Sequence, residues 1–351
     1  MQQVTIIGLG MVGSSLGMAA RAARSGVRVI GYDSDSGVQA RAKRIGAVDD
    51  TEWQLSKAVS GSDLIVLAVP VLEMPELLDL LSNFVGAGTA ITDTASTKRQ
   101  VLGWADEKLP DGVGFVGGDP LAGAGRSGQD EATADLFTGV TYTLIPSLRA
   151  PEETVQTVVD FVKLIGATPY FVDAVEHDSY MAAVVNGPSL MSSALVLAAA
   201  ESPSWREIGK YAAEEFRDLS RLAGVDPKIV QGICSTNQEM VTHWLDNYIT
   251  QLQSLREALQ AQDADEASSQ FRRKLDEAWD ARLRWTAGVG PANAGDPTPQ
   301  EELPSAGNTM AELFLGGAIW RRIRQQSNRT STNGSGGRDK NNPYGQPPGG
   351  V

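Results

Sequence analysis

The 351-residue chain contains one cysteine, Cys234, so it has no second thiol with which to form an internal disulfide. Proteins of reducing compartments rarely contain disulfides, and this composition therefore predicts a cytoplasmic location. Cys234 itself is expected to be a small, buried apolar side chain.

A surplus of positive charge is also missing. The 43 acidic residues outnumber the 30 basic residues and leave a net charge of −13. A nucleic-acid partner requires a basic face that neutralises phosphates, so this composition excludes one. A small anionic substrate requires only a local positive pocket and is compatible with the charge.

Long apolar runs are absent as well. A membrane-spanning helix typically needs about 18 apolar residues, and no apolar run in the sequence reaches that length. The chain enters a strand-like run at Val4, so we expect neither a signal peptide nor a membrane span. With 351 residues, 42% of them hydrophobic and 21% charged, the chain is long enough for two ordinary domains.

The most informative pattern lies near the start of the chain. The apolar, β-branched residues 4–7 are typical of a buried parallel strand, and Gly8, Gly10 and Gly13 follow as G-x-G-x-x-G. In such a loop the first glycine allows the tight turn and the second lets the backbone approach a pyrophosphate. The third allows close helix–strand packing. The spacing predicts a dinucleotide-binding loop.

The residues after this loop point to the cofactor. A helical pattern follows, in which Met11 and Val12 would offer free N–H groups and the positive helix dipole to the phosphates. A second apolar run, residues 27–31, leads to Asp33. Its carboxylate would accept hydrogen bonds from an adenosine ribose and repel a 2′-phosphate. We therefore expect NAD in preference to NADP, and hydride transfer as the chemistry.

Strand-like runs alternate with helical patterns through the first half of the chain. The runs are residues 64–69, 90–93, 114–117, 142–145 and 169–172. Such alternation implies right-handed βαβ units. We expect residues 1–172 to form an α/β, Rossmann-type domain with a doubly wound, mostly parallel sheet. Its loop at Val69 and Pro70 would pass beneath the nicotinamide ribose.

Helical periodicity replaces the strand-like runs in residues 173–286, which predicts an all-α second domain. Helical patterns cover residues 189–200, 205–222, 229–245, 249–261 and 264–285. The run LMSSALVLAAA is apolar nearly all round, which predicts burial in a bundle or in a subunit interface. Helical domains that follow Rossmann domains often dimerise, so we expect a homodimer.

The composition changes again after residue 286. Residues 287–308 are rich in Pro, Gly and acidic residues and are predicted to form a linker. Residues 309–326 have the pattern of one short amphipathic helix, docked on the protein body or lying on a membrane surface. Residues 327–351 are rich in Gly, Asn, Ser and Pro and are predicted to be a disordered tail.

Three further motifs carry a family resemblance. TDTASTK at 92–98, GGDPLAGAGRSG at 117–128 and FRDLSRLA at 216–223 stand in an order that resembles the prephenate and arogenate dehydrogenases. EHDSYMAAVVNGPSLMSSAL at 176–195 resembles the opening of that family's helical domain. The resemblance spans about residues 1–285. It implies NAD(P)-dependent oxidation of prephenate or arogenate at C4, with loss of the ring carboxylate as CO2, in tyrosine biosynthesis.

The resemblance also implies roles for individual side chains. Ser96 matches a serine that hydrogen-bonds the C4 hydroxyl, and Arg221 matches an arginine that grips the substrate carboxylate. Arg217 lies one helical turn earlier, so both guanidinium groups would share a face and suit bidentate carboxylate binding. Asp178 would be an ion-pair partner of Arg221. The competing interpretations are a turn or helix-cap role for Ser96 and a solvated surface face for the arginines.

Histidines are missing where this family carries them. The family's catalytic histidine opens an HPMAG-like motif, whereas Asp119 opens the corresponding DPLAG here. A second family segment, SHLPH, is replaced by VNGPS, so Asn186 and Ser189 would line the substrate pocket instead of histidines. The chain's two histidines are His177, expected to have a structural role at the domain junction, and His243, expected to be an ordinary helix residue.

Asp119 is therefore the candidate general base, acting with Ser96. A carboxylate with an ordinary pKa of about 3.9 is a weaker base than a histidine at about 6.5 unless it is buried, and it would repel a dianionic substrate. Three functions stay open: an aspartate variant of a prephenate or arogenate dehydrogenase, a related hydroxy-acid dehydrogenase, and a non-catalytic NAD-binding dimer. We expect no metal site.

Overall fold

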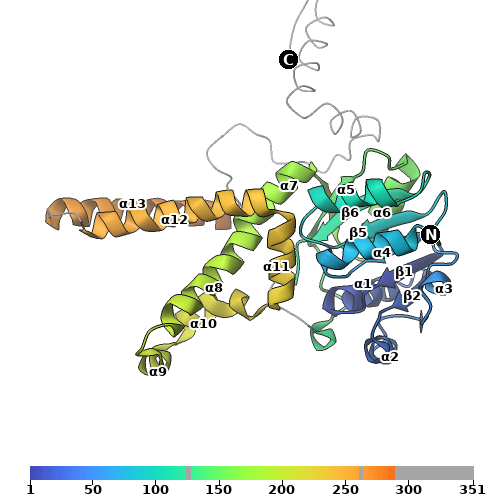
Figure 1. Ribbon diagram of the computed structural model, residues 1–351, viewed down its shortest axis with the longest axis horizontal. Coiled ribbons are helices and arrows are strands. Elements are labelled where there is room, and N and C mark those ends of the chain that lie inside the picture. The colour runs from blue at the N-terminus through green and yellow to red at the C-terminus, as the bar shows by residue number, and fades with distance from the viewer. Residues whose placement is uncertain (124–127, 261–263, 289–351) are drawn as a thin grey trace, which may run out of the picture. The chain divides into compact units, whose positions relative to one another are not determined.

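The computed structural model describes residues 1–123, 128–260 and 264–288. Within them, eight strands form one sheet in the order β3-β2-β1-β4-β5-β6-β7-β8 (Figure 1). The strands are β1 (Gln3–Ile7), β2 (Arg28–Tyr32), β3 (Asp50–Thr51), β4 (Leu64–Leu67), β5 (Ala90–Asp93), β6 (Gly114–Pro120), β7 (Thr141–Pro146) and β8 (Thr168–Phe171).

The sheet is mostly parallel, as predicted. Strands β1 to β6 pair in parallel, β7 runs antiparallel to β6, and β8 runs parallel to β7. The edge strand β3 was not predicted, because its two polar residues, Asp50 and Thr51, are too few to show an alternating pattern.

Helices cover both faces of the sheet, because successive strand residues point to opposite sides. In β1, Val4 and Ile6 join the core beneath α1 and α6, whereas Ile7 joins the core beneath α4 and α5. Burial on both faces explains why these strands are continuous apolar runs in the sequence. The helices of this half are α1 (Met11–Ala22), α2 (Ser36–Arg44), α3 (Leu55–Ala58), α4 (Met74–Leu81), α5 (Arg99–Lys108) and α6 (Glu152–Leu164).

The described chain after β8 is helical, as predicted for a second domain. Figure 1 shows two of its long helices, α12 and α13, side by side. The elements are α7 (Ala174–Met181), the π-helical turn η3 (Ala182–Asn186), α8 (Gly187–Ala200), α9 (Trp205–Ile208), α10 (Glu214–Ser220), the 3-10 turn η5 (Arg221–Gly224), α11 (Pro227–Thr236), α12 (Gln238–Gln260) and α13 (Ala264–Thr286).

Two of the predicted helices are broken. The pattern at 205–222 divides into α9 and α10, because Ala213 has an extended backbone before α10 begins. The pattern at 229–245 divides at Asn237, whose φ of −134° leaves the helical region. Periodicity misses such breaks because the apolar face continues on both sides of each break.

Helix α7, turn η3 and helix α8 follow one another as a single helix, Ala174–Ala200, long and apolar enough to cross a membrane by length and composition. Counting uninterrupted apolar runs misses this helix, because polar residues such as His177 and Asp178 interrupt it. Those two residues bond to the part of the chain that contains the sheet, which we call the sheet half; the helical half follows β8.

The predictions for the C-terminal region fall mainly outside the described residues. They are the linker at 287–308, of which only residues 287 and 288 are described, the helix at 309–326 and the tail at 327–351. The proposed domain boundaries, at residues 172 and 286, stay predictions.

Candidate active site

The glycine loop, residues 8–13 between β1 and α1, has the conformation that its spacing predicts. Gly8 has a φ of +90°, and a Cβ added to it would lie 2.4 Å from the carbonyl oxygen of Ala68. A Cβ added to Gly13 would lie 1.9 Å from the carbonyl oxygen of Gly8. Both positions therefore exclude a side chain, Gly8 by conformation and crowding and Gly13 by crowding alone.

Gly10 is glycine for a different reason. A Cβ added there would meet no atom within 4 Å, so this part of the loop faces open space. Helix α1 begins at Met11, and its first turn contains no acidic residue. The N–H groups of Met11 and Val12 lack partners within the helix, and the helix dipole is positive there. The pyrophosphate of a dinucleotide fits this position.

Asp33 follows β2 and holds the glycine loop in place. Its Oδ2 accepts a hydrogen bond from the N–H of Leu9 at 2.8 Å, and its Oδ1 accepts one from the N–H of Asp35 at 2.9 Å. The side chain is partly exposed, and each carboxylate oxygen can accept a second bond. Contact of Asp33 with a ribose stays a prediction. The structure adds a second role, in which Asp33 holds the backbone of the glycine loop.

Two other segments border the glycine loop. Val69, predicted to lie beside the cofactor, comes within 2.9 Å of a Cβ added to Gly8, and the neighbouring Pro70 is exposed. Gly123 lies against Met11, since a Cβ on Gly123 would fall 2.7 Å from the Met11 Cε. The DPLAG loop therefore ends at the start of α1.

Asp119 lies at the end of β6, where two buried charges hold the strand. Lys98 and Asp93 form an ion pair in which neither side chain is exposed. Lys98 Nζ also donates to the carbonyl of Gly118 at 2.8 Å, and Asp93 Oδ1 accepts from the N–H of Gly118 at 3.0 Å. Such a buried pair is tolerated because hydrogen bonds satisfy both groups. It fixes the backbone immediately before Asp119.

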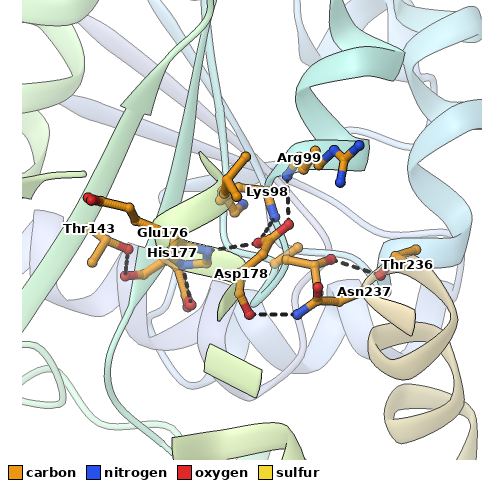
Figure 2. A network of polar contacts seen from close by, with 12 residues as sticks. Lys98, Arg99, Thr143, Glu176, His177, Asp178, Thr236 and Asn237 are labelled. Carbon is orange, nitrogen blue, oxygen red and sulfur yellow. Dashed lines mark hydrogen bonds and ion pairs between the residues drawn. The ribbon is translucent and has the colours of Figure 1, made fainter. Parts of the chain in front are cut away.

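The side chain of Asp119 contacts His177, and Figure 2 shows His177 and Asp178 beside Lys98. Nε2 of His177 lies 3.2 Å from Oδ2 of Asp119, and Nδ1 lies 3.0 Å from Oδ1 of Asp178. Asp119 is 4% exposed, and His177 and Asp178 are each 2% exposed. Oδ1 of Asp119 has no hydrogen-bond partner in the described part of the chain. We call Asp119, His177 and Asp178 the acid–base cluster.

Burial and pairing shift the pKa values in this cluster. Burial raises the pKa of Asp119, and the hydrogen bond and charge of His177 offset only part of that rise. Burial also disfavours the charged form of His177, but its hydrogen bonds to Asp119 and Asp178 outweigh this effect and raise the pKa of His177. An imidazole between two carboxylates favours its protonated state.

Asp178 links the helical half to the sheet half. Its carboxylate accepts hydrogen bonds from the N–H of Lys98 at 2.7 Å and of Arg99 at 3.0 Å, and so caps the start of α5. Its carbonyl accepts one from Asn237 Nδ2 at 2.7 Å (Figure 2). The ion pair expected between Asp178 and Arg221 stays a prediction.

Ser96 lies in the loop between β5 and α5 and is half-buried. Its hydroxyl has no hydrogen-bond partner among the described residues, and the N-cap of α5 is Lys98. Ser96 is therefore not the cap of α5, whereas its place at a bend of the loop agrees with the turn interpretation. Its hydroxyl is available to a ligand. Its bond to a substrate hydroxyl stays a prediction.

Asn186 and Ser189 lie where the continuous helix changes its winding. Asn186 is 3% exposed and ends the π-helical turn, and its Oδ1 has no hydrogen-bond partner in the described chain. Ser189 is half-buried and donates to the carbonyl of Val185 at 3.0 Å. π-Helical turns are frequent at functional sites, and a buried acceptor without a partner is costly unless a ligand pairs with it. Both observations support a pocket-lining role for Asn186.

The two arginines lie on the helical half and are exposed, Arg217 on α10 and Arg221 on η5. Turn η5 packs against α8, where the N–H of Ala223 donates to Ser192 Oγ at 2.9 Å. Neither arginine is bonded to the acid–base cluster. Their role in carboxylate binding stays a prediction.

Comparisons with known proteins agree with the division of the chain into a sheet half and a helical half. Residues 16–171 match the nucleotide-binding domain of prephenate dehydrogenase, and residues 173–276 match its dimerization domain. The chain belongs to the prephenate dehydrogenase family. Its members are oxidoreductases, and the two matches cover the sheet half from residue 16 onward and most of the helical half.

Relatives of the prephenate dehydrogenase family resemble the chain over most of its length. A cyclohexadienyl dehydrogenase of Zymomonas mobilis is 30% identical over 273 residues, 77% of this chain and 93% of the relative. A prephenate dehydrogenase of Bacillus subtilis is 27% identical over 277 residues, 78% of this chain and 74% of the relative. The crystal structure of Aquifex aeolicus prephenate dehydrogenase with hydroxyphenyl propionate and NAD+ aligns with a TM-score of 0.74 and 25% identity, over 81% of this chain and 98% of that one.

The sequence alone predicted part of this site. It selected Asp119 but missed the contact with His177, 58 residues later, and gave Asp93 and Lys98 no role. One signal could have indicated these contacts: a charged residue stands at the end of an apolar strand. A charge that is buried there needs a partner. His243 is exposed on α12, as an ordinary helix residue is expected to be.

Proposed function

We propose that this chain is an NAD-dependent dehydrogenase that oxidises C4 of prephenate or arogenate, with loss of the ring carboxylate as CO2. The position of Asp119 is the observation that carries the proposal. Asp119 is a buried carboxylate with one oxygen that has no partner among the described residues, and the loop it opens ends at the start of α1. Family membership and the NAD+ bound in the A. aeolicus enzyme support the cofactor.

The residues of this chain would divide the work between cofactor and substrate. Bound NAD would accept the hydride that leaves C4. The glycine loop and α1 would hold the pyrophosphate, and Asp33 the ribose. Oδ1 of Asp119 would accept the C4 hydroxyl proton, and Ser96 would hydrogen-bond the same hydroxyl.

A carboxylate suffices as the acceptor, because the hydroxyl becomes a protonated carbonyl, and therefore strongly acidic, as the hydride leaves. When CO2 departs, the electron pair of the broken C–C bond enters the ring, which becomes aromatic. The proton held at Asp119 then returns to the phenolic oxygen. Arg221 and Arg217 would bind substrate carboxylate, and Asn186 and Ser189 would line the pocket.

The test measures NADH formation with prephenate and with arogenate in separate assays. Asp119→Asn should lower kcat by about 10²- to 10⁴-fold, the usual contribution of a general base, while NAD affinity stays unchanged. Arg221→Ala should weaken substrate binding by about 1.5–3 kcal/mol, because it removes a charged hydrogen-bond donor. Arg206→Ala, an exposed arginine on α9, is the control and should change neither value.

Turnover with neither substrate would rule out the proposal. In that case, turnover of another hydroxy acid would favour the related dehydrogenase. NAD binding without any turnover would favour the non-catalytic dimer.

We also infer that two copies associate, in the cytoplasm, through the helical half. The dimerization-domain match supports this, as does the apolar surface along the continuous helix, where Val184 is 70% and Leu197 57% exposed in the single chain. A surface of this kind is stable in water when another subunit covers it. Sedimentation should give the mass of a dimer, and Leu197→Asp should shift it toward the monomer.

A further inference from the structure

The buried position of Asp119 poses an electrostatic problem that the proposed function must solve. A carboxylate out of water tends to take up a proton and become neutral, and a neutral Asp119 could not accept the substrate hydroxyl proton. Its charge would also repel an anionic substrate. A fixed positive charge beside Asp119 would solve both difficulties, and the structure places His177 there.

We propose that His177, held by Asp178 as an imidazolium, keeps Asp119 ionised and aims its free oxygen at the substrate. The inference rests on the proposed function. It makes His177 a positioning residue that acts through Asp119 without itself accepting the substrate proton. The chain would then carry out its oxidation with a carboxylate–imidazolium pair.

The geometry of Asp178 fixes the hydrogen on Nδ1 of His177. The carboxylate of Asp178 accepts two backbone N–H bonds at the start of α5, where the helix dipole also favours negative charge. It therefore remains an acceptor, and Nδ1 of His177 must carry a hydrogen. Nε2 faces Oδ2 of Asp119 at 3.2 Å. Two acceptors cannot face each other there, so a hydrogen lies between Nε2 and Oδ2. In the proposed state it resides on Nε2, where it forms a charge-assisted hydrogen bond with an ionised Asp119.

The remaining titratable groups around His177 do not supply another cation for Asp119. Tyr142 on β7 stays neutral, because burial raises the pKa of its phenol well above the ordinary value. Lys98 and Asp93, from the β5–α5 segment, neutralise each other. Glu239 on α12 is exposed and pairs with Arg99, and Glu176 on the same helix as His177 is exposed. Among the described residues, the imidazole is thus the cation in contact with Asp119. The raised pKa of His177 agrees with this assignment.

The proposal predicts the direction of the pH dependence. If His177 is an imidazolium during turnover, kcat/KM should fall as pH rises through its pKa, because the ionised Asp119 then faces an anionic substrate without its counterion. If a neutral histidine were the base, kcat/KM would instead rise through that pKa. At low pH, protonation of Asp119 should give the opposing limb. The two assignments therefore predict opposite slopes above the ordinary histidine value.

The first experiment does not depend on turnover. The chain has only two histidines, so 13C-histidine NMR gives two titrating signals, and His243→Gln assigns them. We expect His177 to titrate above the ordinary pKa of about 6.5 in the natural chain and at lower pH in Asp119→Asn. A His177 titration that is the same in Asp119→Asn would overturn the proposal, whatever the enzyme assay shows.

The second experiment uses activity. His177→Asn should lower kcat by about 10²-fold, the lower end of the range for a disabled general base, and should abolish the alkaline limb. His243→Gln should retain the natural profile. An unchanged alkaline limb in His177→Asn, or a natural profile that rises through the pKa of His177, would contradict the proposal and leave the dehydrogenase function standing. Absence of turnover in the natural chain would instead count against the proposed function. The NMR titration alone would then test whether Asp119 and His177 form a carboxylate–imidazolium pair.

Discussion

The glycine loop and the acid–base cluster hold their ligand-facing groups in different ways. The glycine loop uses backbone groups from one strand–loop–helix unit, with steric exclusion at Gly8 and Gly13. The acid–base cluster uses side chains from β6 and α7, fixed by the start of α5 and by Asn237. In the proposed function, cofactor binding therefore depends on local backbone shape, whereas proton transfer depends on contacts between the two halves of the chain.

The largest expected effect separates the two kinds of glycine within the loop. Gly13→Ala should lower the free energy of unfolding by about 1–3 kcal/mol or more, because its Cβ would collide with the carbonyl of Gly8. Gly10→Ala should leave stability unchanged, because its Cβ meets no atom, but should weaken NAD binding by occupying open space beside α1. Thermal denaturation and NAD titration measure the two effects. Equal NAD affinity in Gly10→Ala and the natural chain would refute the assigned role of Gly10.

An intermediate effect should come from breaking the link between the halves. Asp178→Asn replaces one accepting oxygen by an NH2 group that faces N–H donors, so it should cost about 1–3 kcal/mol in thermal denaturation. Asp173→Asn is the matched control on the same helix. Asp173 caps the exposed start of α7, and asparagine caps equally well, so its effect should be near zero. Equal stabilities of the two variants would mean that Asp178 does not join the halves.

The smallest expected effect concerns cofactor choice. Asp33→Ser should raise kcat/KM for NADP relative to NAD by about tenfold, or about 1.4 kcal/mol, because it removes the charge that would repel a 2′-phosphate. Asp35→Ser is the control, since Asp35 caps α2 and serine also serves as an N-cap. A ratio that is unchanged in Asp33→Ser would leave Asp33 only its role in holding the N–H of Leu9.

Prediction succeeded where a pattern is local. The strand runs, the glycine spacing and the position of Asp33 all lie within short segments whose backbone geometry follows from periodicity and turn chemistry. Prediction failed at Asn237, which breaks a helix in order to bond Asp178, because the benefit of that break comes from a residue 59 positions away. It also missed that Asp178 caps α5, because that helix belongs to the other half of the chain.

The sequence by itself determined the fold class, the dinucleotide loop and the substitution at Asp119, because each depends on neighbouring residues alone. Only the tertiary structure decided what surrounds Asp119. Strand β6 and helix α7 bring a carboxylate and an imidazole to 3.2 Å, and the start of α5 holds the second carboxylate. Burial makes those contacts consequential, since charges removed from water must be compensated by partners that only folding brings together.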